Sequence, residues 1–126
     1  MRYLIDTNCC IYLFNTRHQV LRDRMMATEA GEIALSAVVL AELGVGAVLG
    51  KAPQRDQLAR LREELPILSF EEQDSDVYAR LPFRRDRFDA LIAAQAISRG
   101  LTLITANERD FADVPGLKIE NWTLPL

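Results

Sequence analysis

Short apolar segments alternate along the chain with longer stretches of helical periodicity. Four segments have the length and composition of buried strands: residues 2–6, 33–35, 66–69 and 101–105. Apolar positions spaced three and four apart predict helices between them, at residues 8–14, 16–27, 37–49, 54–65, 70–81 and 87–99. Residues 117–119 alternate like an edge strand. This order predicts an α/β fold with helices on both faces of a short parallel sheet, in three layers.

The predicted helix at residues 37–49 is apolar on every face, which predicts that it is buried. Glu42 is the only charged residue between Glu32 and Lys51. An unpaired carboxylate in an apolar setting costs several kcal/mol or becomes protonated. A bound cation would compensate for this charge, and so would an arginine partner or a position near solvent.

The first predicted strand ends in a polar cluster. Residues 3–5 are apolar, and Asp6, Thr7 and Asn8 follow directly. The carboxyl ends of parallel strands open into the crevice where ligands bind, so Asp6 is placed to meet a metal ion. Capping of the following helix by one of the three residues is an equally good explanation of this stretch.

Two more polar clusters follow later in the chain. Asp86 and Asp89 begin the predicted helix at residues 87–99, where acids are also favoured as a cap and by the helix dipole. Thr105, Asn107 and Asp110 follow the fourth strand, as Asp6 follows the first, although Thr and Asn are also ordinary turn residues. Carboxylates and amides in these places are oxygen ligands of the kind that Mg²⁺ or Mn²⁺ binds, and such ions promote phosphodiester cleavage.

Composition narrows the class of protein. The 126 residues predict a single domain over residues 1–126. No apolar run approaches the ~20 residues of a membrane helix, so we expect a soluble, cytoplasmic protein without membrane contact. The net charge of −3 argues against binding nucleic acid through global charge. Adjacent Cys9 and Cys10 suit a reducing compartment, and the absence of a phosphate-binding glycine loop disfavours a nucleotide-binding α/β domain.

The segments at residues 4–8, 35–43, 86–96 and 101–107 together resemble PIN domains, and among them the VapC-type toxins of bacterial toxin–antitoxin modules. The resemblance covers nearly the whole chain. It implies a three-layer α/β/α PIN-like domain with a short central parallel sheet. The implied activity is that of a Mg²⁺- or Mn²⁺-dependent endoribonuclease that inhibits translation as the toxin of a type II module.

The resemblance also assigns roles to residues. It implies that Asp6, Glu42 and Asp89 are catalytic and that Asp6 and Asp89 hold the metal. The supporting positions are Thr7, Asn8, Ser36, Asp86, Thr105, Asn107 and Asp110.

The fourth acidic position departs from the family pattern. Many relatives carry Asp where this chain has Asn107, and a neutral amide binds a cation more weakly, which puts a second metal in doubt. Glu108 or Asp110 is a candidate replacement. Asn107 also favours the alternative function, a catalytically weak PIN fold that acts mainly as a binding module.

The expected partners are an RNA substrate, a cognate VapB-like antitoxin and a second copy of the chain, in a homodimer and a toxin–antitoxin hetero-oligomer. Arg84, Arg85 and Arg87 lie just before Asp89 and are candidates for RNA phosphates, or equally for acidic residues of the antitoxin. The antitoxin is expected on one of two apolar faces. These are Ile11, Leu13 and Phe14 in one helix, and Leu58 and Leu61 in another.

Overall fold

The computed structural model describes residues 1–82 and 87–125, without the side chain of Arg87. The strands are β1 (Tyr3–Ile5), β2 (Ile33–Ser36), β3 (Ile67–Leu68), β4 (Thr102–Ile104) and β5 (Ile119–Glu120). The helices are α1 (Thr7–Tyr12), α2 (Gln19–Met26), α3 (Ala37–Val48), α4 (Arg55–Glu64), α5 (Glu72–Arg80), α6 (Arg87–Arg99) and α7 (Glu108–Phe111).

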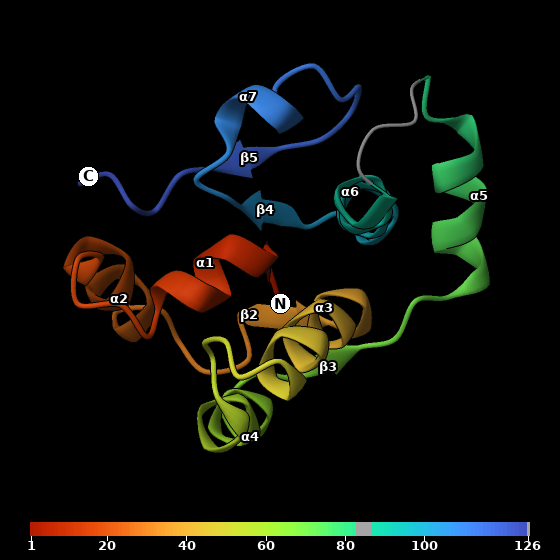
Figure 1. Cartoon of the computed structure of the whole chain (residues 1–126). Helices are drawn as coiled ribbons and strands as arrows, with labels where there is room; N and C mark the ends of the chain where they lie inside the picture. Colours follow the sequence, from red (N-terminus) through yellow and green to blue (C-terminus); the bar gives the residue numbers. More distant parts are fainter. Residues whose placement is uncertain (83–86, 126) are drawn as a thin grey trace.

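The five strands form one parallel sheet in the order β3-β2-β1-β4-β5. The chain builds from β1 to one edge, returns through α5 and α6, and adds β4 and β5 on the other side of β1. Figure 1 shows α1 and α2 on one side of the sheet and α5 and α6 on the other. The predicted α/β/α layering and the parallel sheet are therefore confirmed.

The central strands are mostly apolar because helices cover both faces of the sheet. Leu4, Ile5, Leu35, Leu103 and Ile104 are all fully buried. Short apolar runs of this kind are the pattern from which the strands are predicted. β1, β3 and β4 are shorter than predicted, β2 extends one residue further, and β5 begins at the last residue of the predicted segment 117–119. The helix α6 has the predicted bounds.

The expectation that residues 37–49 form a buried helix is wrong. In α3, Val39 and Leu43 are buried, whereas Val45, Val48 and the C-cap residue Leu49 keep 63%, 77% and 66% of their surface exposed. When a helix has no polar face, its sequence does not show which face packs against the rest of the protein. Composition therefore predicts the helix but not its orientation.

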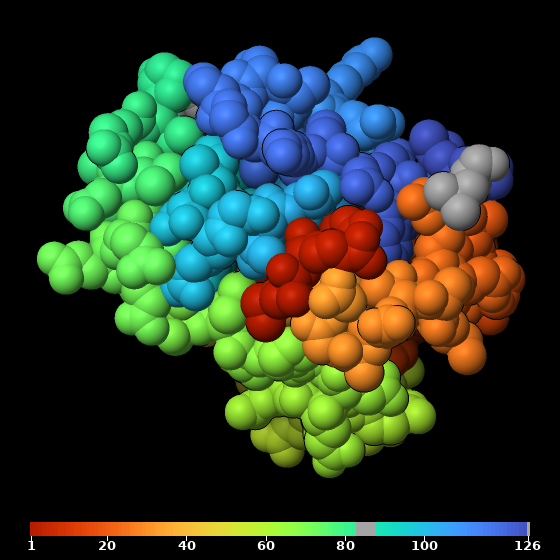
Figure 2. All heavy atoms as spheres, turned by 180° about the vertical axis from the view of Figure 1, so that it is seen from behind, coloured from red at the N-terminus to blue at the C-terminus, as the bar shows by residue number. Residues whose placement is uncertain are grey.

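The amino ends of the strands lie at the opposite edge of the sheet from the polar clusters. There the N-terminal ammonium group and the Arg2 side chain both pair with Glu32, which precedes β2. Figure 2, a view from behind, shows the N-terminal residues lying beside this segment. Within the described ranges, no helix is both long enough and apolar enough to cross a membrane.

Candidate active site

The carboxyl ends of the three central strands bring polar side chains to one edge of the sheet. β1 pairs in register with β2 on one side and β4 on the other, so the residues that end these strands lie at one level. They are Asp6 after β1, Ser36 at the end of β2 and Thr105 after β4. All three are buried. This is the edge at which parallel α/β sheets bind their ligands.

Asp6 is held through both of its carboxylate oxygens. It is the N-cap of α1, and its Oδ1 accepts a hydrogen bond of 2.8 Å from the backbone N–H of Cys9. Its Oδ2 accepts a hydrogen bond of 2.5 Å from the hydroxyl of Thr105, 99 residues away in sequence. The capping explanation of Asp6 is thus correct, but capping engages only one oxygen. The second bond ties the first strand to the turn after the fourth.

The electrostatics of Asp6 favour a nearby positive charge. Only 4% of its surface is exposed, and this burial raises the pKa of its carboxyl group above the ordinary value. The hydrogen bonds from Thr105 and Cys9 oppose this rise without cancelling it. Among the described residues, no cationic side chain forms an ion pair with Asp6. A cation from solvent would therefore stabilise the ionised form of this acid.

Glu42 lies in the second turn of α3 and is half-buried. The expectation that it is enclosed by apolar side chains is therefore wrong, and it lies closer to solvent. Its Oε1 accepts a hydrogen bond of 2.6 Å from the hydroxyl of Thr7, in the first turn of α1. Ser36 caps α3 by accepting from the backbone N–H of Val38 at 3.0 Å. Thr7 therefore links Glu42 to the segment of Asp6, and Ser36 sets where the helix of Glu42 begins.

Asp89 occupies the first turn of α6 and is half-buried. This helix packs against α3, the helix that carries Glu42, and α3 begins directly after β2. Asn8 is exposed in the first turn of α1. Asp86, predicted to cap α6, lies outside the described residues.

The polar cluster that follows β4 is connected to Asp6 through Thr105. The hydroxyl of Thr105 accepts a hydrogen bond of 2.9 Å from the backbone N–H of Asn107, the N-cap of α7. The side-chain amide of Asn107 donates to Oδ2 of Asp110 at 2.8 Å. Oε2 of Glu108 instead accepts a hydrogen bond of 3.2 Å from the side chain of Asn121, which follows β5. The two candidate replacements for the missing acid thus have different partners.

The donor chemistry fits a hard cation with a largely aqueous shell. Within residues 1–82 and 87–125, no three His, Cys, Asp or Glu side chains lie close enough together to hold a metal ion by themselves. Mg²⁺ needs no such cage, because it keeps several waters and binds proteins through one or two carboxylates. Asp6 offers such a carboxylate, held in place by Thr105 and Cys9.

The predicted RNA-binding residues are not tested by the structure. Arg84 and Arg85 lie outside the described residues, as does the side chain of Arg87. Arg80, at the end of α5, is described and exposed.

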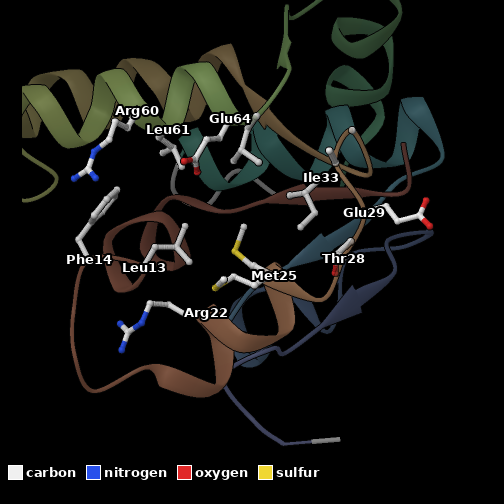
Figure 3. Close-up of a pocket in the computed structure, with 14 residues that line it drawn as sticks. Leu13, Phe14, Arg22, Met25, Thr28, Glu29, Ile33, Arg60, Leu61 and Glu64 are labelled. Carbon is white, nitrogen blue, oxygen red and sulfur yellow. The ribbon is translucent and has the colours of Figure 1, made fainter.

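A cavity of about 480 Å³ lies between α1, α2 and α4, away from the site just described. Figure 3 shows Leu13 and Met25 pointing into it, with Phe14 and Arg60 at one end. Leu61 lines it from α4. Of the predicted partner faces, Leu13, Phe14 and Leu61 therefore meet in one hollow. Sequence periodicity marks these residues as apolar but cannot show that two distant helices leave a gap between them.

The pattern of conserved features that defines the PIN domain matches residues 3–117, so the chain belongs to the PIN domain family. It is 31% identical over 132 residues to Ribonuclease VapC2 of Rickettsia felis. It is 30% identical over 132 residues to the tRNA(fMet)-specific endonuclease VapC of Salmonella typhimurium. Each alignment covers 97% of this chain and 98% of the relative. The predicted relationship to VapC-type ribonucleases is confirmed.

Solved structures agree with the sequence relationships. The chain superposes on a protein of the VapBC2 complex from Rickettsia felis, bound to a DNA fragment from its promoter, with a TM-score of 0.83 and 29% identity. That match covers 97% of this chain and 99% of the other. DNA-bound VapBC from Salmonella typhimurium gives a TM-score of 0.82 and 28% identity over 97% of this chain and 98% of the other. These matches confirm the PIN-like α/β/α fold.

Proposed function

We propose that this protein is a Mg²⁺- or Mn²⁺-dependent endoribonuclease that inhibits translation as the toxin of a type II toxin–antitoxin module. The observation that carries the proposal is the environment of the Asp6 carboxylate. It is a buried carboxylate at the ligand-binding edge of the sheet, its pKa is raised by burial, and no described cation pairs with it. The similar proteins from Rickettsia felis and Salmonella typhimurium are named as VapC ribonucleases, which supports RNA as the substrate of this protein.

In this proposal Asp6 and Asp89 hold the metal ion and Glu42 completes the catalytic set. The ion, when bound, lowers the pKa of a water molecule and stabilises negative charge on the phosphate. The chain's own hydrogen bonds keep the acids in place: Cys9 and Thr105 hold Asp6, and Thr7 holds Glu42. Arg84, Arg85 and Arg87 are proposed to bind RNA phosphates.

The test is cleavage of structured RNAs by the parent protein and by Asp6→Asn, with Mn²⁺ and with chelator. The panel includes the initiator tRNA named for the Salmonella relative. We expect cleavage only with metal and a loss of at least ~10²-fold in Asp6→Asn, the scale of losing one key electrostatic group. Asp56→Asn, on exposed α4, is the matched control. Equal rates for Asp6→Asn and the parent would contradict the proposal.

The alternative function, a binding module with little activity, is favoured by one residue, Asn107. Titration of the purified protein with Mn²⁺ separates the two functions. A nuclease should bind Mn²⁺ and lose this binding in Asp6→Asn, whereas a bare scaffold should bind no ion through Asp6.

We also propose that the 480 Å³ cavity receives an apolar segment of a VapB-like antitoxin. Several of the similar solved structures are toxin–antitoxin complexes, which supports such a partner. Met26 lines the cavity and is 86% exposed, so Met26→Glu should reduce co-purification of the antitoxin without unfolding the toxin. Leu124→Glu, at an exposed apolar residue outside the cavity, is the control. Equal co-purification by both variants would contradict this location.

The homodimer also remains a proposal. The exposed stripe of Val45, Val48 and Leu49 on α3 is a candidate surface for it. Light scattering of the purified chain tests the oligomeric state, and a monomer at every accessible concentration would contradict it.

A further inference from the structure

The hydroxyl of Thr105 stands between two parts of the site that are far apart in sequence. Thr105 is fully buried and directly follows β4. Its Oγ1 donates to Oδ2 of Asp6 and accepts from the backbone N–H of Asn107, at 2.5 Å and 2.9 Å. The Thr105 side chain therefore contacts both the first acid of the site and the turn that carries the fourth position.

The direction of these bonds follows from the chemistry of the groups. A backbone N–H can only donate, so Asn107 occupies an acceptor position on the hydroxyl of Thr105. The hydroxyl has a single proton, and the acceptor that lies within reach of it is the Asp6 carboxylate. The Asn107 amide thus orients Thr105 as a donor to Asp6. With Cys9 N–H on Oδ1, this second bond fixes the plane of the carboxylate.

We propose that Thr105 is a positioning residue that sets the Asp6 carboxylate in its metal-binding orientation and couples it to the turn at Asn107. This inference rests on the proposed function, because it concerns how Asp6 binds a divalent ion. A carboxylate held at both oxygens presents its remaining lone pairs in one direction. Without Thr105 the acid loses the donor to Oδ2, and Cys9 alone holds it.

The hydroxyl can be removed with little change of shape. Thr105→Val replaces it by a methyl group, and Thr105→Ser keeps it while removing the methyl group. Thr105→Ala also removes the hydroxyl and leaves a smaller side chain than Val. It replaces Thr105→Val in the experiment if the Val variant does not fold. Thr102→Val, on the same strand, is the matched control, since Thr102 is half-buried and its side chain has no hydrogen bond among the described residues.

The experiment measures the Mn²⁺ affinity of each folded variant by electron paramagnetic resonance of the free ion, with RNA cleavage as a second readout. Loss of an outer-shell hydrogen bond to a metal ligand typically weakens affinity by ~10- to 100-fold. We expect a loss of this size in Thr105→Val and Thr105→Ala. Thr105→Ser should restore affinity to near the parent value, and Thr102→Val should leave it unchanged.

Hydrogen exchange of the Asn107 amide is a readout that needs no metal. It should accelerate in Thr105→Val, where the acceptor is gone, and stay slow in Thr105→Ser. The positioning role would be overturned if Thr105→Val bound Mn²⁺ as tightly as the parent. It would also be overturned if Thr105→Ser lost as much affinity as Thr105→Val. In either case the nuclease assignment would stand. A parent protein that binds no Mn²⁺ would overturn the proposed function and the positioning role together.

Discussion

Among the described residues, the carboxylates of Asp6 and Asp74 are almost fully buried, and their surroundings differ. Asp74, in the first turn of α5, accepts from Nε of Arg99 at 3.0 Å and from its Nη2 at 2.9 Å. It also accepts from the backbone N–H of Glu71 at 2.7 Å. Asp6 accepts from the hydroxyl of Thr105 and from Cys9, through the backbone N–H of Cys9 and also its side chain. Within the part of the chain that the structure describes, Asp74 has a cationic partner and Asp6 has neutral donors only.

The pKa values of the two acids are shifted in opposite directions. Burial raises the pKa of both carboxyl groups. At Asp74 the hydrogen bonds from Arg99, Glu71 and Ser98 outweigh burial, and the pKa falls below its ordinary value. At Asp6 burial dominates and the pKa stays raised. Burial alone therefore does not mark a functional acid. An acid that is buried without an internal cation is the better candidate for binding one from solvent.

The largest expected effect comes from removing the cation of the structural acid. Arg99→Met should lower the free energy of unfolding by about 3–5 kcal/mol, because it leaves the buried Asp74 carboxylate without its partner. Urea unfolding in chelator measures this change. Arg62→Met, at an exposed arginine of α4, should change stability by less than ~0.5 kcal/mol. A similarly small change in Arg99→Met would mean that Asp74 does not depend on the pair.

The converse experiment adds a cation to the other acid. Mn²⁺ at a hundred times its dissociation constant should raise the unfolding free energy of the parent by about 2.7 kcal/mol, by mass action. It should not stabilise Asp6→Asn. In chelator that variant should be as stable as the parent or more stable, because a buried charge has been removed. Equal stabilisation of both proteins by Mn²⁺ would place the ion elsewhere.

The pH dependence of stability should separate the two acids further. Because the folded-state pKa of Asp74 is lowered, its ionised form stabilises the native protein above the unfolded-state pKa of ~3.9. This contribution is lost as the pH falls through the lower, folded-state pKa. The stability difference between the parent and Asp74→Asn should therefore be constant near neutral pH and shrink below about pH 4. A constant difference down to the acid transition would contradict the lowered pKa.

Much of the fold could be predicted because local patterns determine it. The mostly apolar strands and the bounds of α6 can be predicted from the sequence, and so can the position of Asp6 and Thr105 at one sheet edge. The packing of α3 could not be predicted, since its apolar pattern does not distinguish the buried Leu43 from the exposed Val48. Interactions between residues that are distant in sequence can be seen only in the three-dimensional structure.

The same limit applies within the site. Asp6 and Glu42 could be selected as unusual acids from their neighbours in sequence. Their hydrogen bonds to Thr105 and Thr7 span 99 and 35 residues, and no spacing rule links such positions. The Asp74–Arg99 pair was missed for the same reason, because an acid in the first turn of a helix is ordinary in sequence.

Glu42 offers an intermediate case between the two buried acids. In Glu42→Gln the new side-chain oxygen can still accept from Thr7, and interactions of partly exposed charges are worth about 0–1 kcal/mol. We therefore expect the metal-free stability to change by less than ~1 kcal/mol, while Mn²⁺ affinity falls. Glu63→Gln, on exposed α4, is the control. Thermal melts in chelator that show a marked loss would instead identify a structural ion pair at Glu42.

The smallest expected effects concern the fourth acidic position. The comparison here is between Asp110 and Glu108, two exposed acids in the short helix α7. Asp110 is joined to Asn107, whose backbone N–H reaches Asp6 through Thr105, whereas Glu108 is joined to Asn121 after β5. Asp110 is thus connected to the site and Glu108 to the C-terminal segment. Asn107→Asp should tighten Mn²⁺ binding, because it adds a negative charge beside this connection.

Asp110→Asn should slow cleavage more than Glu108→Gln does, through a water held by the metal ion. Exposed charges contribute about 1 kcal/mol or less, so each change should be no more than roughly fivefold. Mn²⁺ titration and single-turnover cleavage of one RNA, for all three variants in parallel, resolve differences of this size. If Glu108→Gln is the more damaging change, the Asn107–Asp110 hydrogen bond does not govern the site, and Glu108 becomes the auxiliary acid. If Asn107→Asp weakens Mn²⁺ binding, the amide of Asn107 is required as a donor to Asp110, and the neutral residue is the functional one.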